Sequence, residues 1–485
     1  MSELVSPFYK QGKKKKINKN KNKNEGSNLL LILELHSQSL PVTAAGATAS
    51  DTAHQLPAKP PSRTANEGDS AEEVEKVDIL VAGSLAVDLA CDYVPRAAER
   101  MMNVTPSLHT SNPAIIEQSL GGVGYNVAIA AKHVGSSVLF CSLVGDDLTG
   151  RAALASLHGE GLHAEGVQIL PSSAAARTAQ YVATNDANKD LFVAMADMSI
   201  MELPERDLDF EGTWEPMVRR TKPRWVVVDG NWSPGVLKKW VDLGKQYESR
   251  VAFEPVSLSK SRGVFAAIGP SDTVPNNKVS LAAPNKLELV AMHEQAHIQG
   301  LFESAEWWDV INSMGISSSN SRERLVAITS ATLVDEGTPQ QSIQLLPFMP
   351  CVITKLGSQG VLLTQLLRSG DPRLSSAEHA PYILSVLSGA SGERGIIGGV
   401  YMRLFPPAKV LTPESITSVN AAGDTLVGVL VAGLARTSEQ GRATMGIEEL
   451  IEIAQDASVE TLKSSGGVSG NISRLREVLR GKQIT

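Results

Sequence analysis

Short apolar segments alternate along this chain with stretches of helical periodicity, and this alternation limits the fold more than any other feature. The segment VDILVAGSLAVDL, residues 77–89, opens the pattern with an apolar run that closes on Gly83-Ser84, as a buried parallel strand entering a turn does. Similar runs lie at Val138–Val144, Trp225–Asp229, Arg250–Glu254, Leu325–Thr329 and Cys351–Lys355, and helical patterns at Tyr125–His133, Gly150–His158 and Gly235–Tyr247. Strands that alternate with helices predict an α/β layered domain around a mainly parallel sheet.

Three stretches interrupt this alternation. Residues 90–120 carry scattered apolar residues and prolines without a helical pattern, and residues 177–200 resemble two strands around an Asn185-Asp186 turn. Together they predict a small β-flap outside the main sheet. Residues 369–399 are rich in Ser and Gly, which predicts a surface insertion.

The first 76 residues differ in composition from the rest, being Lys/Asn-rich, then Ala/Ser/Thr/Pro-rich, then acidic. A segment of this kind cannot bury enough apolar surface to offset chain entropy. The sequence therefore predicts a disordered extension over residues 1–76 and one folded domain over residues 77–485. The lysine cluster near the start is typical of a solvated tail, with a nuclear-localisation or nucleic-acid signal as the alternative.

Charge and cysteine content exclude several classes of protein. The net charge of -7 and the pI near 5.8 argue against a general nucleic-acid binder, because affinity for a phosphate backbone needs a basic face. Cys91, Cys141 and Cys351 lie far apart and predict neither a disulfide framework nor a zinc site. No apolar run approaches about 18 residues, and the basic start lacks the layout of a secretory signal. We therefore expect a cytoplasmic protein that binds neither membrane nor nucleic acid.

A glycine-rich segment, GGVGYNVAIAAKHVG, occupies residues 121–135. Its glycines let the backbone turn tightly and approach a ligand, and Asn126 opens a helix whose N-terminus favours polar or anionic groups. A turn of this kind also occurs in α/β folds for packing alone, so both interpretations stay open.

A second segment, SVNAAGDT at residues 418–425, precedes an apolar helical stretch. Small residues at the start of a helix form an anion cradle of backbone N–H groups, and Asp424 would face whatever that cradle holds. A carboxylate there suits the base that accepts a proton from a hydroxyl attacking a phosphoryl group. An Asp that merely caps the helix explains the segment equally well.

Two further segments carry polar groups at defined spacing. Asn285 and Glu288 share a helical face and could help to hold Mg²⁺ largely through water, although the same spacing forms a capping box. The segment TKLGSQGV, residues 354–361, predicts a strand that ends in a Gly/Ser hairpin, which could hold nucleotide phosphate or ribose or could be a bare hairpin.

The order and spacing of these four segments resemble the ribokinase-like, or PfkB-type, carbohydrate kinases, over roughly residues 77–479. The resemblance implies a three-layer α/β/α sandwich with a mainly parallel central sheet and a small β-flap that acts as a lid, built from segments about 90–120 and 177–200. It also implies ATP and Mg²⁺ as cofactors, a small sugar or nucleoside as substrate, and a flap that can serve as a homodimer surface.

The resemblance assigns roles residue by residue. Substrate contacts are implied for Asp88, Gly121, Gly122 and Asn126; the anion hole and base for Ala421, Ala422, Gly423 and Asp424; nucleotide contacts for Thr354, Gly357 and Gly360; and magnesium for Asn285 and Glu288. Two departures stand out. Ser418-Val419-Asn420 replaces the Asp-Thr that many members use beside a monovalent cation, which puts potassium activation in doubt, and Val123-Gly124-Tyr125 replaces the usual glycine motif.

Residues 110–128, 177–200 and 228–234 are most similar to the pseudouridine kinase branch of this family. The resemblance therefore implies an ATP-dependent kinase of the 5′-hydroxyl of pseudouridine, with base recognition by the flap and by Asp229–Trp232. The alternatives are a ribokinase-like kinase of a free sugar or another nucleoside, and a catalytically silent nucleotide-binding relative. A glycosidase domain, which eukaryotic fusions of this branch add, has no counterpart in residues 1–76.

Overall fold

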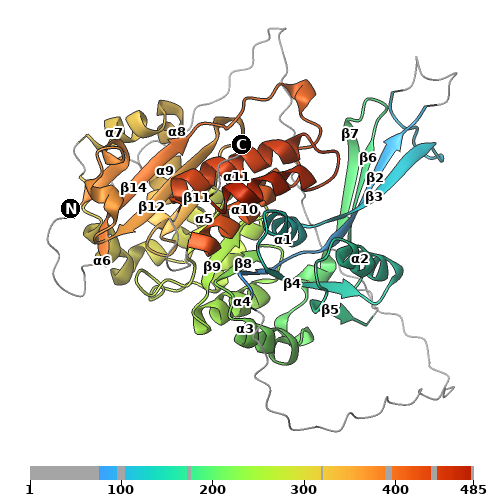
Figure 1. Ribbon diagram of the computed structural model, residues 1–485, viewed down its shortest axis with the longest axis horizontal. Coiled ribbons are helices and arrows are strands. Elements are labelled where there is room, and N and C mark those ends of the chain that lie inside the picture. Colours follow the sequence, from blue (N-terminus) through green and yellow to red (C-terminus); the bar gives the residue numbers. More distant parts are fainter. Residues whose placement is uncertain are drawn as a thin grey trace, which may run out of the picture. The chain divides into compact units, whose positions relative to one another are not determined.

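The computed structural model describes residues 76–95, 104–171, 176–317, 320–387, 396–437 and 445–481. Its described strands form a ten-stranded sheet in the order β13-β14-β12-β11-β10-β9-β8-β1-β4-β5 (Figure 1). The strands are β1 (Ile79–Ala82), β4 (Val138–Gly145), β5 (Gly166–Leu170), β8 (Trp225–Asp229), β9 (Arg250–Glu254), β10 (Leu281–Ala282), β11 (Cys351–Lys355), β12 (Val361–Arg368), β13 (Ile383–Val386) and β14 (Ile397–Phe405).

The sheet is parallel from β5 to β11 and antiparallel from β11 to β13. In the parallel part, alternate side chains of one strand enter two separate cores: Ile79 and Val81 join one apolar cluster, and Leu80 and Ala82 join the other. Burial on both faces explains why these strands appear in the sequence as continuous apolar runs.

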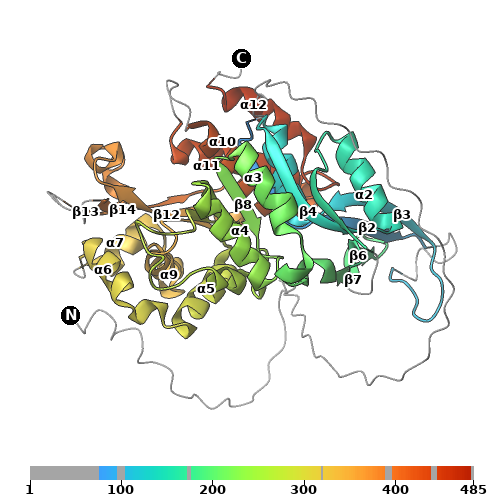
Figure 2. The same ribbon diagram turned by 90° about the horizontal axis from the view of Figure 1, so that it is seen from below.

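Helices cover both faces of the sheet, which completes the expected three-layer sandwich (Figure 2). One face carries α1 (Val123–His133), α2 (Leu148–Gly159), α10 (Ala422–Thr437), α11 (Ile447–Leu462) and α12 (Leu475–Val478). The other carries α3 (Glu215–Thr221), α4 (Pro234–Gln246), α5 (Lys286–Ile298), α6 (Ala305–Ser313), α7 (Ser321–Ile328), α8 (Ala331–Asp335) and α9 (Thr338–Leu345). None of the described helices combines the length and apolarity needed to cross a membrane.

The predicted flap is a second sheet of order β3-β2-β6-β7, which lies to the right in Figure 1. Its strands are β2 (Ala86–Tyr93), β3 (Ala114–Gly121), β6 (Ala179–Asn185) and β7 (Leu191–Asp197). Asp186 forms the turn between β6 and β7, since its Oδ1 accepts from the backbone N–H groups of Asn188 and Asp190. The flap prediction is confirmed, with β2 beginning a few residues before the expected boundary.

Two local predictions were wrong. Leu325–Thr329 was expected to be a strand but lies mostly in α7, where Leu325 and Ile328, three residues apart, are buried on one helical face. A short apolar run does not by itself distinguish a strand from the buried side of a helix. Residues 369–399 are also more than a surface insertion, because β13 and the start of β14 extend the sheet from within them; residues 388–395 lie outside the described residues.

Candidate active site

The candidate site lies where the carboxyl ends of parallel strands meet the N-terminus of α10. Asp229, Glu254 and Lys355 are the last residues of β8, β9 and β11. Ligands of open α/β sheets bind at this edge, because the loops and helix N-termini there converge. Chain segments more than a hundred residues apart therefore supply neighbouring side chains.

Asp424, the predicted base, lies in the first turn of α10 and contacts the glycine-rich segment. Asn126 Nδ2 donates to Asp424 Oδ2 over 2.9 Å, which joins two segments that the sequence separates by 298 residues. Asn126 is 8% exposed, and its Oδ1 is buried without a hydrogen-bond partner. A buried amide oxygen of this kind favours a donor such as a substrate hydroxyl.

The surroundings of the Asp424 carboxyl shift its pKa. Burial raises its pKa to about 6, while Asn126 and Lys355 oppose the shift and Asp229 and Glu288 add to it. Asp424 still retains partial solvent contact. A carboxylate with a pKa closer to neutral is a better proton acceptor than an ordinary one, as catalysis by a general base requires.

The predicted anion cradle, the backbone of Ala421–Asp424, forms a tight entry to α10. Ala421 has a left-handed backbone with φ 60°, and α10 begins at the next residue. Ser458 of α11 donates to the Ala422 carbonyl over 2.9 Å and holds the turn from behind. A Cβ added to Gly423 would lie 3.3 Å from Lys355 Nζ, so the absent side chain leaves room beside that ammonium group.

Lys355 and Glu254 form a buried ion pair at the edge of the cradle. Lys355 Nζ donates to both Glu254 carboxylate oxygens, over 2.7 and 2.8 Å. Burial alone would lower the pKa of Lys355, but Glu254, Glu288 and Asp424 together raise it above its ordinary value, so the ammonium stays charged. Burial in turn raises the pKa of Glu254, against the opposing effect of Lys355. Three carboxylates thus surround one ammonium group.

Asn285 and Glu288 form the capping box that was the alternative to a metal site. The Asn285 side chain accepts from the Glu288 backbone N–H over 2.9 Å, and Glu288 Oε2 accepts from the Asn285 backbone N–H over 2.8 Å. Glu288 is nevertheless buried beside Lys355 and Asp424. In the described part of the chain no cluster of three or more His, Cys, Asp or Glu side chains could hold a metal directly. The role of Asn285 and Glu288 in holding magnesium stays a prediction.

The predicted nucleotide hairpin is present between β11 and β12, and its members differ in position. Thr354 is fully buried, and its hydroxyl lies 3.5 Å from that of Ser342 in α9, on the opposite side of the sheet from α10. Gly357 has φ 59° and open space where a side chain would stand. At Gly360, with φ 90°, a Cβ would lie 2.0 Å from the Phe405 carbonyl oxygen. Gly360 is therefore required by the fold, and Gly357 is free to face a ligand.

The lid brings Asp88 to the start of the glycine-rich segment. A Cβ on Gly121 would lie 2.2 Å from Asp88 Oδ2, so this glycine makes space for the carboxylate; Gly122, with φ 96°, makes the turn into α1. Burial raises the pKa of Asp88 to about 6. Among the described residues, no group is hydrogen-bonded to the Asp88 carboxylate. In register across β3, β2 and β6, Ser119 and Tyr181 flank Asp88 on the same face.

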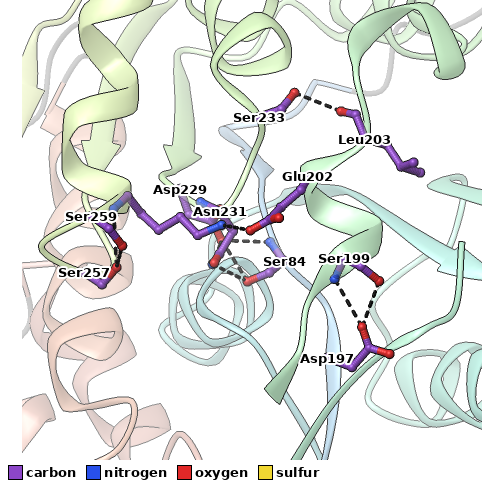
Figure 3. A network of polar contacts seen from close by, with 11 residues as sticks. Ser84, Asp197, Ser199, Glu202, Leu203, Asp229, Asn231, Ser233, Ser257 and Ser259 are labelled. Carbon is purple, nitrogen blue, oxygen red and sulfur yellow. Dashed lines mark hydrogen bonds and ion pairs between the residues drawn. The ribbon is translucent and has the colours of Figure 1, made fainter. Parts of the chain in front are cut away.

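Asp229 and Asn231 belong to an interior network rather than to an open pocket (Figure 3). Asp229 accepts from the backbone and side chain of Ser84 over 2.8 and 2.9 Å and from the Asn231 backbone over 3.0 Å. Trp232 packs against Trp214, with ring centroids 5.6 Å apart. Asp229 and Asn231 are buried and hold the Gly83-Ser84 turn in place, while Trp232 Nε1 is buried without a hydrogen-bond partner. The expectation that Asp229–Trp232 recognise a nucleobase stays a prediction.

Sequence reasoning missed Glu254 and Lys355 as members of the site. Glu254 was noted only as the end of an apolar run, and Lys355 only as part of the hairpin segment. The available signal was a charged residue closing each of two buried strands, at the edge where ligands bind. Their pairing across 101 residues has no local sequence signature.

A ten-stranded, mostly parallel sheet between two layers of helices, with a separate four-stranded β-flap, is the architecture of the ribokinase-like fold. A sequence profile of the pfkB family carbohydrate kinases matches residues 78–315. Residues 78–315 are therefore similar to the pfkB family carbohydrate kinases.

Two curated proteins show the similarity in sequence. The chain is 29% identical over 404 residues to the pseudouridine-metabolizing bifunctional protein of Schizosaccharomyces pombe, covering 82% of this chain and 47% of that protein. It is 24% identical over 241 residues to the pseudouridine kinase of Escherichia coli, covering 50% of this chain and 71% of that enzyme. The chain thus spans about half the length of the first relative and about 71% of the second.

Solved structures confirm the fold. Arabidopsis thaliana ribokinase, determined with ribose and ATP, superposes with a TM-score of 0.51 at 14% identity, covering 84% of this chain and 99% of the ribokinase chain. The expected ribokinase-like sandwich is therefore confirmed, while the roles of the individual site residues stay predictions.

Proposed function

We propose that this chain transfers the γ-phosphoryl group of ATP to the 5′-hydroxyl of pseudouridine. The observation that carries the proposal is the contact between Asn126 and Asp424, which places a carboxyl of raised pKa next to an unpartnered amide oxygen at the entrance to the anion cradle. Both curated relatives have pseudouridine in their names, which supports the choice of substrate within the kinase class.

The reaction divides among the described residues as follows. Asp88 accepts hydrogen bonds from ribose hydroxyls, and the free Oδ1 of Asn126 accepts one from a ribose hydroxyl other than the attacking one. Asp424 takes the hydroxyl proton as the oxygen forms its bond to the γ-phosphorus, and the bond from that phosphorus to the β-phosphate oxygen breaks to leave ADP. The N–H groups of the Ala421–Asp424 cradle stabilise the charge of the phosphoryl group in transit.

ATP and Mg²⁺ fit the charges of this edge. The cradle and the space beside Gly423 suit phosphate oxygens, and Gly357 leaves the hairpin open for the nucleotide. The excess of carboxylates around Lys355 suits a divalent cation. Because Glu288 is bound in its capping box, Mg²⁺ would be held by Glu288 and Asn285 through water and by the phosphates, and when bound it would neutralise charge on the transferred group.

Discrimination between nucleosides falls mainly to the lid, because Asp229 is already occupied by hydrogen bonds from Ser84 and Asn231. Ser119 and Tyr181 present hydroxyl groups on both sides of Asp88, where they can pair with the additional ring N–H that distinguishes pseudouridine from uridine. A site that pairs a polar group rejects an analogue lacking it, because its own partner is left unsatisfied.

The opposite face of the lid supports the proposal of a homodimer. Ile116 and Met195 are 64% and 69% exposed there, next to Val193. A second copy of the lid would remove this apolar surface from water. Sedimentation of the full chain against a variant with Ile116→Lys and Met195→Lys tests the dimer, and an unchanged sedimentation coefficient would count against this face.

A panel of acceptors tests the proposed function. ADP release by the purified full chain is measured with ATP, Mg²⁺ and pseudouridine, uridine, adenosine, ribose or fructose, and the phosphorylated position is read by phosphorus–proton coupling. We expect kcat/KM for pseudouridine to exceed that for uridine and for ribose by at least about tenfold. Ribose or adenosine as the best substrate would overturn the pseudouridine assignment and leave the kinase standing. ADP release that no acceptor stimulates would overturn the kinase and favour a silent nucleotide-binding relative.

A further inference from the structure

The Lys355 ammonium is a buried cation whose presence the preceding roles do not explain. Its side chain is 16% exposed and that of Glu254 is 3% exposed. Removing both charges from water is costly, and a buried ion pair often stabilises a protein no better than an apolar pair of similar volume. Stability therefore gives little reason for a charged pair at this point.

The position of the Lys355–Glu254 ion pair gives a functional reason for its buried charges. Alternation along β11 turns Thr354 toward α9 and Lys355 toward the face that carries α10. The Lys355 backbone N–H donates to the Pro284 carbonyl over 2.8 Å, next to the Asn285 cap, so the base of the side chain is fixed. The Nζ then lies against Gly423 in the cradle, where a Cβ would approach it to 3.3 Å.

The ammonium group has donor capacity left for a ligand. A lysine carries three N–H donors, and among the described residues only the two oxygens of Glu254 accept from Nζ. Glu254 comes from β9, separated from β11 in the sheet only by β10, so it restrains Nζ from one side. The remaining side faces the cradle that Gly423 leaves open.

We propose that Lys355 is a catalytic residue that donates a charge-assisted hydrogen bond to the phosphoryl group in transfer, and that Glu254 is a positioning residue that holds its ammonium beside the Gly423 cradle. The inference rests on the proposed function for the identity of the anion. A fixed charge aimed at the place where negative charge develops needs no reorganisation during the reaction, so its effect falls on kcat.

Three variants of the full chain test this inference: Lys355→Met, Glu254→Gln, and the two together. Lys355→Met keeps most of the side-chain volume and should lower kcat by about 10²–10³. The KM for the acceptor should stay within about threefold, because the lost contact belongs to the transition state. Glu254→Gln should lower kcat by about 10–10² by loosening the ammonium. The double variant also removes both charges together, which guards against unfolding caused by a single unpaired charge.

Non-additivity separates positioning from an independent role. If Glu254 acts through Lys355, the double variant should match Lys355→Met within about threefold. Losses that multiply in the double variant would overturn the positioning role, and a Lys355→Met enzyme with kcat within about threefold of normal would overturn the catalytic role. Lys278→Met is the matched control, because Lys278 is also partly buried between two carboxylates, Asp242 at 2.9 Å and Asp272 at 3.4 Å, outside the site.

The contact between Lys355 and the phosphoryl group can also be measured without turnover, through the binding of ADP with aluminium fluoride. This complex mimics the phosphoryl group in transfer. If the unaltered chain phosphorylates no acceptor, the proposed function fails, and this binding decides the inference separately. At least about tenfold weaker binding by Lys355→Met would support the contact, and unchanged binding would overturn it.

Discussion

Replacing Asp424 by Asn tests the assignment of the base with the smallest change of shape. Asn has the same size and can still pair with Asn126, which lies 2.9 Å away, but it cannot accept the hydroxyl proton. Loss of a positioned general base lowers kcat by about 10²–10⁴. We expect Asp424→Asn to retain ATP binding and to lose turnover on this scale.

The same substitution should stabilise the protein, which an Asp serving only as a helix cap would not predict. The native pKa of Asp424 is raised from 3.8 to about 6, so above that pH the folded state carries a charge that its surroundings disfavour. The penalty is absent below about pH 4, where both states are protonated, and is complete above about pH 6. Two pKa units correspond to at most about 3 kcal/mol, and the partial solvent contact of the side chain reduces this. Thermal unfolding at pH 7.5 should therefore show a higher Tm for Asp424→Asn.

The assay is ADP release from pH 5 to 8.5 for the unaltered chain and the variant. For the unaltered chain, kcat/KM should rise with pH and level off above an apparent pKa of about 6, since only the ionised carboxyl accepts a proton. The residual activity of Asp424→Asn should lack this step. Asp209→Asn serves as control, because Asp209 caps the turn at Gly212 over 2.9 Å and should leave kcat unchanged. Near-normal turnover by Asp424→Asn would refute the assignment.

Three further outcomes follow from the site and its frame. Asp88→Asn should lower kcat/KM for the nucleoside by about 10–10², the scale of a hydrogen bond to a charged group, and an unchanged value in acceptor titrations would remove Asp88 from the substrate site. Gly360→Ala should lower the free energy of unfolding by at least about 2 kcal/mol in urea titrations, because its Cβ would lie 2.0 Å from the Phe405 carbonyl oxygen. Gly357→Ala should lower it by about half as much, because the Cβ there enters open space. Equal losses in the two variants would contradict this reasoning. Removal of residues 1–76 should leave Tm and kcat unchanged, since every core residue that the structure describes lies at or beyond Val77, and a truncated chain that fails to fold would show that the extension contributes to the domain.

The sequence by itself determined the fold class and supplied the residues of the candidate site. Apolar runs that alternate with helical patterns are local signals, and strands buried on both faces make them strong, so the sandwich and the lid could be predicted. The order of the glycine-rich, Asn-x-x-Glu, hairpin and Ala-Ala-Gly-Asp segments was also sufficient to single out Asp424 and Asn126. Each of these motifs lies within a few consecutive residues, so it can be identified without knowledge of the packing.

Only the tertiary structure decided which side chains meet. Thr354 and Lys355 are neighbours in one segment, but strand alternation buries the first against Ser342 and turns the second to the cradle. Glu254 becomes part of the site because β9 and β11 are separated only by β10, an arrangement set by sheet order rather than by sequence spacing. Asp229 accepts two hydrogen bonds from Ser84, a contact across 145 residues that its position at the end of an apolar run does not reveal. The direction in which a side chain points and the groups that it contacts depend on how distant strands assemble. No local pattern in the chain encodes that assembly.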